Sequence, residues 1–272
     1  MKLATIRTAE GTRAVRVEDD GYVDLLAADV GELLALEGWQ ERAAAADERV
    51  EGELATLVAR PGKIVCVGLN YAPHILEMGR ELPGYPTLFA KYAESLVGPY
   101  DPIVLPAASR AVDYEAELAL VIGRRVRDAD EGEATAAIAG FTVCNDVTMR
   151  DWQYRTKQWL QGKTFEATTP LGPVLTTPDE LAGGVRPDLG IRTILDGEKM
   201  QEASTSELVF DPVDLVSYVS TIVTLQPGDV IATGTPGGVG HARKPPRYLQ
   251  DGDVLVTEID GLGRCENPVV EA

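Results

Sequence analysis

The chain has 272 residues, 44% hydrophobic content and a formal net charge of −18, from 43 acidic and 25 basic residues. This length is enough for one large domain, or for a large domain with a small additional module. Phosphate binding requires a basic patch and the chain has no dense basic cluster, so nucleic acid is not an expected partner. An acidic surface also disfavours anionic membranes.

The cysteines and the N-terminal sequence bear on the compartment. Cys66, Cys144 and Cys265 lie far apart and show no CxxC spacing, which is typical of a reducing compartment. The first residues have the pattern of a strand, without the apolar region of a signal peptide, and no stretch of 18 apolar residues follows. We therefore expect a cytoplasmic protein that does not associate with membranes.

The first 60 residues are predicted to form a small N-terminal α/β module. Three short strands are expected at Lys2–Thr8, Thr12–Glu18 and Tyr22–Leu25, separated by turn residues. Residues 26–58 are rich in Ala, Leu and Glu at helical spacing. The sequence Arg60-Pro61-Gly62 interrupts this pattern, so we place the domain boundary there, with the main domain at 61–272.

Strands outnumber helices in the remainder of the chain, and the helices do not alternate regularly with them. A short helix is expected near 73–78 with Asn70 as its N-cap, and another from Asp211 to about Val223. Strands are predicted at Lys63–Val67, Thr87–Tyr92, Gly140–Asn145, Gly172–Leu175, Ile191–Leu195, Val230–Thr233 and Val254–Ile259. This order disfavours a Rossmann sheet or an eightfold βα barrel. We expect an α+β, β-rich fold, in which a mixed β-roll or barrel is covered by a few helices.

Residues Asp113-Tyr114-Glu115-Ala116-Glu117 carry three acids immediately before an apolar run. On a strand, alternate side chains share a face, so these acids would point the same way. Carboxylates grouped near a core are unfavourable unless a cation lies among them. Mg²⁺ and Mn²⁺ prefer oxygen ligands, which makes a metal site one interpretation. A solvated acidic strand end is the other.

His74 and Glu77 are three residues apart on the predicted short helix, so their side chains are neighbours. A carboxylate beside an imidazole raises its basicity and orients it, as in a water-activating base. An ordinary surface pair has the same spacing. The location after a buried strand and a turn favours a functional role, because loops commonly carry function.

Two further segments carry polar groups at strand ends. Asp146 ends a buried strand and precedes Arg150, Gln153 and Lys163, which could face a small anion; a lone Asp at this position is otherwise a common helix N-cap. The glycine-rich segment 233–240 lacks the Lys-Ser/Thr of a P-loop, so nucleotide binding is disfavoured. We expect its backbone N–H groups to bind a carboxylate.

Taken together, these motifs resemble the fumarylacetoacetate hydrolase superfamily, in its acylpyruvase and 2-hydroxyhepta-2,4-diene-1,7-dioate isomerase-like branch. The resemblance runs from about Lys63 to Asn267 and rests on five blocks in order: Val67–Tyr71 with His74 and Glu77, Asp113–Glu117, Asn145-Asp146 with Arg150-Asp151, Gly162-Lys163, and Thr233–Gly240. Many relatives carry Arg where this chain has Leu69, so any role of that Arg toward a substrate carboxylate is missing or filled by another residue.

The resemblance implies a role for each matching residue. Glu115, Glu117 and Asp146 match the ligands of Mg²⁺ or Mn²⁺, and Asp113 is not among them. His74 and Glu77 match the His–Glu pair on a mobile lid segment. The remaining matches are Arg150, Gln153 and Lys163, which stabilise an oxyanion, and Thr235, which contacts substrate. A homodimer is also expected.

The implied substrate is a small 2-oxo acid. Our leading hypothesis is metal-dependent hydrolysis of a C–C bond in a 2,4-dioxo acid, an acylpyruvate such as fumarylpyruvate, to pyruvate and a carboxylic acid. In this hypothesis Glu77 orients His74, which activates water, while Lys163 and Gln153 stabilise the oxyanion. Oxaloacetate decarboxylation and isomerisation or hydration of a 2-hydroxy-dienoate use the same type of site and remain open. A catalytically idle protein that binds a 2-oxo acid is the non-enzymatic alternative.

Overall fold

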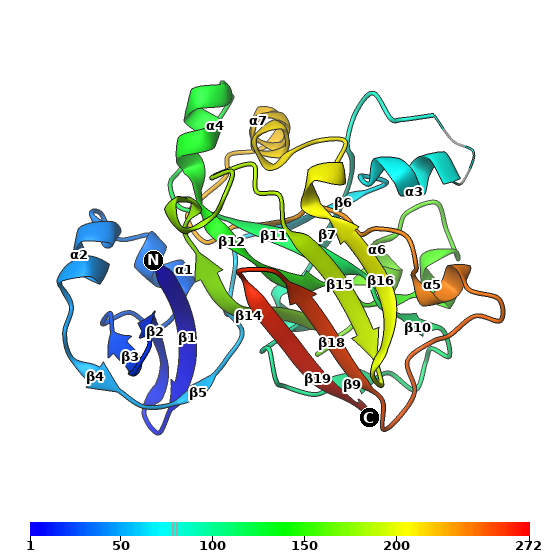
Figure 1. The fold of residues 1–272 in the computed structure, drawn as a ribbon, viewed down its shortest axis with the longest axis horizontal. Helices are drawn as coiled ribbons and strands as arrows, with labels where there is room; N and C mark the ends of the chain where they lie inside the picture. The colour runs from blue at the N-terminus through cyan, green and yellow to red at the C-terminus, as the bar shows by residue number, and fades with distance from the viewer. Residues whose placement is uncertain (78, 80) are drawn as a thin grey trace.

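The computed structural model describes residues 1–77, 79 and 81–272. Within this part of the chain the fold is α+β and β-rich, which confirms the predicted class (Figure 1). The strands are β1 (Lys2–Thr8), β2 (Gly11–Glu18), β3 (Gly21–Asp24), β4 (Arg49–Val50), β5 (Glu53–Leu54), β6 (Ile64–Gly68), β7 (Thr87–Lys91), β8 (Leu96–Val97), β9 (Ile103–Leu105), β10 (Val112–Asp113), β11 (Ala116–Ile122), β12 (Ile138–Asn145), β13 (Thr148–Met149), β14 (Thr169–Thr176), β15 (Gly190–Leu195), β16 (Glu198–Ser204), β17 (Val230–Ala232), β18 (Val254–Ile259) and β19 (Gly263–Glu271). The α-helices are α1 (Val30–Leu34), α2 (Trp39–Ala45), α3 (Ala72–Glu77), α4 (Glu131–Ala137), α5 (Arg150–Gln153), α6 (Leu160–Lys163) and α7 (Pro212–Ile222).

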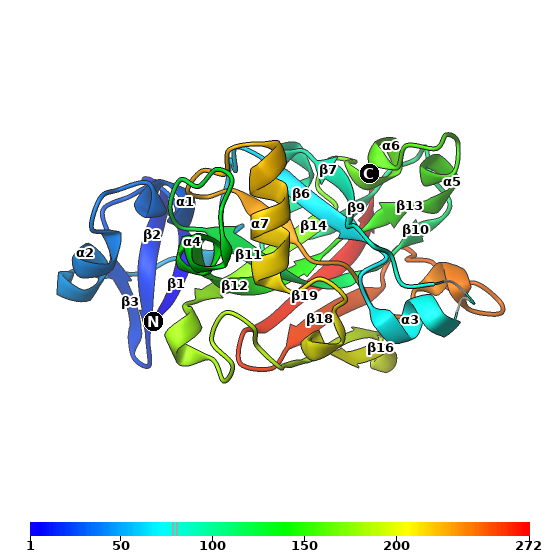
Figure 2. The same ribbon diagram turned by 90° about the horizontal axis from the view of Figure 1, so that it is seen from above.

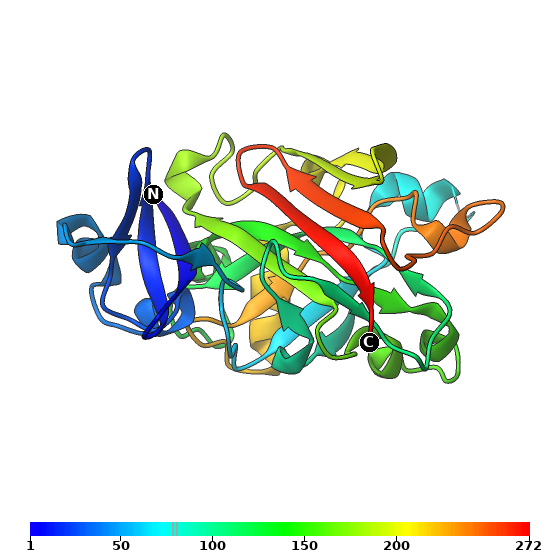
Figure 3. The ribbon, with the colours of Figure 1, turned by 90° about the horizontal axis from the view of Figure 1, so that it is seen from below.

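One long mixed sheet runs through the molecule in the order β4-β3-β2-β1-β14-β12-β11-β17-β6-β7. A second sheet, β16-β15-β18-β19-β9, lies against it, and β10 pairs separately with β13. The last strand, β19, crosses the middle of the molecule when it is seen from below (Figure 3). The two sheets together give the roll expected from the high proportion of strands.

The N-terminal strands extend the long sheet, because β1 pairs antiparallel with β14 through Leu3 and Leu175. They form a lobe at one end of the molecule, while α3, α5 and α6 gather at the opposite end (Figures 1 and 3). Leu3 and Leu33 share a hydrophobic cluster with Ala119 and Leu171 of the central strands. The proposed module at 1–60 is thus joined to the remainder by both strand pairing and packing.

Strand β11 is buried on both faces, and its side chains alternate between two cores. Leu118 and Leu120 lie in the cluster with α7, whereas Ala119 and Val121 lie in the cluster that includes the N-terminal region. This alternation follows from the period of two along a strand. Figure 2 shows α7 lying across the long sheet above β11 and β12. Capping by Asp211, with Pro212 at the first position, starts α7 as predicted.

Several local predictions are wrong. Residues 26–58 contain only two short helices, and their last part forms β4 and β5 in the sheet. The terminal segment expected as a tail is the nine-residue strand β19. Asn70 does not cap α3: its side chain donates to the carbonyls of Phe210 and Thr233 and accepts from the Phe210 N–H. Met78, the last residue of the expected helix, lies outside the described residues.

No helix among the described residues is long and apolar enough to cross a membrane.

Candidate active site

Three carboxylates converge at the ends of two paired central strands. Glu115 immediately precedes β11, Glu117 lies in it, and Asp146 follows β12. The two strands pair with Glu117 opposite Cys144, and the Asp146 N–H donates to the Glu115 carbonyl at 2.9 Å. One oxygen from each of the three acids lies within 4.8 Å of the others. Residues some thirty positions apart therefore form a single buried acidic triad.

Lysine side chains neutralise two members of this triad. Lys163 Nζ, on α6, lies 2.7 Å from Glu115 Oε2 and 2.7 Å from Asp146 Oδ2. Lys91 Nζ lies 2.7 Å from the other oxygen of Asp146. Burial alone would raise the pKa of Asp146, but the two ammonium groups outweigh burial and lower it. Burial lowers the pKa of Lys163, and the carboxylates more than reverse this, so Lys163 stays charged.

Glu117 is the member of the triad that fits a metal ion best. One oxygen accepts from the Gly234 N–H at 2.9 Å, and no Lys or Arg among the described residues forms an ion pair with this side chain. Burial, followed by the nearby carboxylates of Asp146 and Glu115, raises the pKa of Glu117 well above its ordinary value. A divalent cation held by the three acids would reverse this effect. The donor set is composed of carboxylate oxygens, which suits Mg²⁺ or Mn²⁺.

Asp113 is fully buried and is not one of the three grouped acids, as the resemblance implies. Its burial excludes the solvated acidic strand end that was the other interpretation of this segment. Strand β10 ends at Asp113, and β11 begins only at Ala116. Asp113 Oδ2 accepts from Arg150 Nε at 2.8 Å. Its two oxygens also accept the N–H groups of Gly240 and His241. The N–H groups at the two ends of the glycine-rich segment thus bind carboxylates of the protein itself, Glu117 and Asp113.

Arg150 connects Asp113 to the triad and orients Gln153. Its Nη2 lies 2.6 Å from Glu115 Oε1, and its Nη1 donates to Gln153 Oε1 at 3.0 Å. The Gln153 acceptor is therefore occupied, and its two N–H donors are left for the cavity. This arrangement is compatible with the substrate-binding role expected for both residues.

His74 and Glu77 lie on α3, beside Gly237 of the glycine-rich segment. A Cβ placed on Gly237 would lie 3.2 Å from His74 Nδ1 and 3.7 Å from Glu77 Oε2, so both side chains border this glycine. No hydrogen bond joins them in the described structure. Burial lowers the pKa of His74, and the charges of Glu77 and Glu115 oppose this effect. His74 is therefore neutral near pH 7 and able to accept a proton.

A cavity of about 120 Å³ brings the predicted groups together. Its lining residues are Val67, Gly68, Leu69, His74, Phe89, Glu115, Glu117, Arg150, Gln153, Tyr154, Trp159, Lys163 and Thr235. Of the nine predicted site residues, only Glu77 and Asp146 are outside this lining. Glu77 lies on the same helix as His74, and Asp146 accepts a hydrogen bond from Lys163. Leu69 lies in the lining at a backbone φ of 56°, in the left-handed region.

Other residues of the site were not predicted from the sequence. Lys91 is fully buried at the end of β7, and a lysine inside an apolar strand is itself an unusual feature that could have identified it. Trp159 packs against Gly68 and Phe89 and forms one wall of the cavity. Gln201, on β16, bonds to both Ala116 and Thr235. Nothing in the local sequence around Trp159 or Gln201 distinguishes them.

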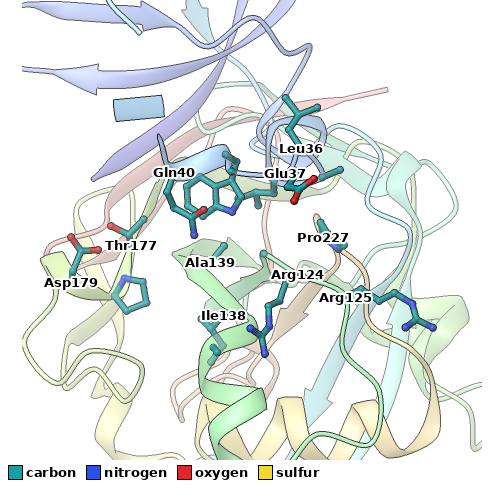
Figure 4. A pocket seen from close by; sticks show the side chains of 17 residues that line it. Leu36, Glu37, Gln40, Arg124, Arg125, Ile138, Ala139, Thr177, Asp179 and Pro227 are labelled. Atoms are coloured by element: carbon teal, nitrogen blue, oxygen red, sulfur yellow. The ribbon is translucent and has the colours of Figure 1, made fainter. Parts of the chain in front are cut away.

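A larger cavity, of about 480 Å³, lies between the N-terminal region and the central strands and shares no lining residue with the first. Figure 4 shows Glu37 and Gln40 on one side of it and Arg124 and Ile138 on the other. The triad, the lysines and His74 are all absent from its lining. We assign the active site to the smaller cavity because the reactive groups converge there.

The buried triad, its lysine partners and the β-roll define a class of enzyme. The chain belongs to the fumarylacetoacetate hydrolase superfamily: the family model described as "Fumarylacetoacetate (FAA) hydrolase C-terminal" matches residues 63–270. Rat oxaloacetate tautomerase Fahd2a, mitochondrial, is 48% identical over 214 residues, which cover 78% of this chain and 68% of the rat protein.

Solved structures agree with this assignment over the whole chain. The fumarylacetoacetate hydrolase from Exiguobacterium antarcticum is 35% identical, with a TM-score of 0.88 and 100% coverage of both chains. The 2-hydroxyhepta-2,4-diene-1,7-dioate isomerase from Mycobacterium marinum is 31% identical, with a TM-score of 0.79 and coverage of 100% of this chain and 98% of that one. The names of these relatives include a hydrolase, a tautomerase and an isomerase. The rat relative is mitochondrial, and the cytoplasmic location and the homodimer expected for this chain stay predictions.

Proposed function

We propose that the protein is a Mg²⁺- or Mn²⁺-dependent oxaloacetate tautomerase, which interconverts the enol and keto forms of oxaloacetate. The observation that carries this proposal is the identity of 48% to the rat tautomerase over 214 residues. The family model matches residues 63–270, which include the whole triad and every lining residue of the cavity. This proposal replaces acylpyruvate hydrolysis as the leading hypothesis. It shares its substrate with the oxaloacetate decarboxylation, and its proton transfer with the isomerisation, that the sequence left open.

The size of the cavity supports a small substrate. Its volume is about 120 Å³, against about 480 Å³ for the larger cavity. Trp159 and Phe89 close one side, with their ring centroids 5.5 Å apart. A four-carbon dioxo or oxo diacid therefore suits this space better than an acylpyruvate with a long acyl group.

The charges of the site match the chemistry of an enol. A divalent cation held by Glu115, Glu117 and Asp146 would act as a Lewis acid toward the C2 oxygen. Lys163 uses two of its three N–H donors on Glu115 and Asp146, and the third is left for the developing negative charge. Gln153 and Thr235 supply neutral donors to the carboxylates of the substrate.

In this proposal His74 moves the proton at C3. As a neutral base it removes a proton from C3 of the keto form, and the electrons of that C–H bond become the C2–C3 double bond. The C2 oxygen then takes a proton from solvent, and His74 returns its proton to solvent. In the reverse direction the imidazolium of His74 protonates C3. Glu77 stabilises the charged form of His74.

Acylpyruvate hydrolysis is the second candidate, because His74 lines the cavity and Glu77 lies beside the same glycine, Gly237, on the same helix. One experiment separates the candidates. Crystalline enol-oxaloacetate is dissolved in weak buffer and the loss of enol absorbance is followed with Mg²⁺ or with EDTA, while pyruvate release is measured from oxaloacetate and from an acylpyruvate. We expect Mg²⁺-dependent ketonisation without matching pyruvate release. Decay at the rate of the blank would refute the proposal, and faster pyruvate release from the acylpyruvate would favour hydrolysis.

A further inference from the structure

Gln201 is a fully buried side chain outside the cavity whose four hydrogen-bonding positions are all occupied. Its Oε1 accepts from the Ala116 N–H at 3.0 Å and from Thr193 Oγ1 at 2.7 Å. Its Nε2 donates to Thr235 Oγ1 and to the Pro236 carbonyl, both at 2.9 Å. A side-chain amide can make two acceptor and two donor bonds, so none remains free.

The partners of Gln201 fix the direction of its amide. The Ala116 N–H can only donate, and the Pro236 carbonyl can only accept. A flipped amide would place its NH₂ group against the Ala116 N–H and its oxygen against the Pro236 carbonyl, leaving buried polar groups unpaired. The amide nitrogen therefore faces Thr235, and the Thr235 oxygen accepts that bond.

This bond determines what Thr235 can offer to a ligand. A threonine hydroxyl has one hydrogen, and here its oxygen already accepts from Gln201. No other protein group among the described residues accepts that hydrogen, and Thr235 lines the cavity together with Glu117 and Lys163. The hydroxyl is therefore free to donate into the cavity.

We infer that Gln201 is a positioning residue that holds the Thr235 hydroxyl as a hydrogen-bond donor to a carboxylate of the substrate. Because its other end binds the N–H of Ala116, between Glu115 and Glu117, the same amide sets the distance from this donor to the acidic triad. The glycine-rich segment is confined at this point, since a Cβ on Gly238 would lie 2.3 Å from the Met200 carbonyl. This inference rests on the proposed function in that Thr235 is taken to contact substrate.

The variant Gln201→Glu tests the direction of the bond. A carboxylate at this position still accepts from Ala116 and Thr193, but toward Thr235 it presents an acceptor instead of a donor. The Thr235 hydroxyl would then turn to donate to Glu and away from the cavity. We expect KM for oxaloacetate to rise about tenfold or more, as for the loss of a hydrogen bond to a charged group, with a much smaller change in kcat.

A double-mutant cycle with Thr235→Val separates positioning from a general structural effect. Thr235→Val removes the hydroxyl at nearly constant shape, and we expect a similar rise in KM. In the Thr235→Val background, Gln201→Glu should have little further effect on KM. Thr235→Ser should retain most of the wild-type affinity. Thr142→Val, at a buried hydroxyl without a partner in the described chain, is the matched control and should leave KM unchanged.

Binding of oxalate to the Mn²⁺-loaded protein, measured by calorimetry, provides a readout independent of turnover. We expect the dissociation constant to follow the same cycle. Equal effects of Gln201→Glu in both backgrounds, or no effect in either, would overturn the inference. If Gln201→Glu does not fold, Gln201→Ala enters the same cycle with the same criterion. Failure of the wild-type protein to ketonise enol-oxaloacetate would refute the proposed function instead, and the oxalate cycle would still decide the role of Gln201.

Discussion

Two walls of the active-site cavity are built in different ways. The carboxylate wall, formed by Glu115, Glu117 and Asp146, lies at the ends of buried strands and is held by ion pairs to lysine and arginine side chains. The α3 wall, formed by α3 with His74 and Glu77, is anchored mainly by one fully buried side chain, Ile75. Its neighbour Leu76 is 58% exposed.

The base of the α3 wall is better fixed than α3 itself. Asn70 makes three hydrogen bonds through its side chain, to Phe210 and Thr233, and Tyr71 forms a β-bridge with Leu208. In the proposed function the two walls have different tasks: the carboxylate wall, which is held by ion pairs, would hold the cation, and the α3 wall would supply the proton-transferring group. Substitutions in the two walls should therefore separate metal binding from chemistry.

The largest effect is expected for Glu117→Gln in the carboxylate wall. The amide keeps the shape but removes the one triad charge that lacks a lysine or arginine partner among the described residues. We expect the rise in melting temperature caused by Mn²⁺ to disappear and ketonisation to fall to the level seen with EDTA. Glu37→Gln, at an exposed acid, is the control. Full activity with a normal Mn²⁺ response in Glu117→Gln would show that the triad does not hold the metal.

A smaller loss, confined to chemistry, is expected for His74→Ala. Removing a general base lowers the rate by about 10²- to 10⁴-fold, whereas the triad and its ion pairs are untouched. Ketonisation rates and the Mn²⁺-induced rise in melting temperature measure the two effects separately. Leu76→Ala, on the exposed side of the same helix, should change neither. Loss of the Mn²⁺ response in His74→Ala would contradict the division between the walls.

The fold class and the carboxylate wall were accessible from the sequence because they rest on local patterns. The apolar run after Glu117 identifies a buried strand, and the acids at its start identify the polar end of that strand. The failures have tertiary causes. Residues 49–54 form β4 and β5 because β3 and β1 provide backbone pairing partners for them, although the segment 26–58 as a whole has a helical composition. The strand β19 was missed because its pairing partners, β18 and β9, determine it.

Prediction of the site residues was limited in the same way, because contacts between distant parts of the chain decide their roles. Glu115 and Asp146 lie at strand ends and were identified as candidates from chemistry and resemblance together. Asp113 has the same spacing, but strand β10 ends at this residue, and its carboxylate accepts from Arg150 and from the N–H groups of Gly240 and His241 instead of joining the triad. Gln201 could not be found, since its function depends on contacts with residues 34 and 85 positions away.

The pH dependence of activity tests whether His74, in the α3 wall, is the general base. His74 must be neutral to accept a proton, and burial lowers its pKa below the ordinary value of 6.5. Activity should therefore fall only as the pH drops below that value. Glu77 raises the pKa of His74, so Glu77→Gln should lower it further and move the acidic limb of the kcat profile to lower pH. A shift toward higher pH, or no shift, would mean that another group controls this limb.

The smallest effect is expected for Gly237→Ala, which alters the α3 wall without removing any of its functional groups. The added Cβ would lie 3.2 Å from His74 Nδ1, so the imidazole must move by a few tenths of an ångström. Because misplacement of about 1 Å can lower a rate by about 10²-fold, we expect a loss of kcat of about threefold to tenfold. Gly84→Ala, where a Cβ would meet no atom within 4 Å, is the matched control. The Mn²⁺ response should be unchanged in both variants, since neither glycine contacts the carboxylate wall. A loss of Mn²⁺ binding in Gly237→Ala would mean that the two walls are mechanically coupled through the glycine-rich segment.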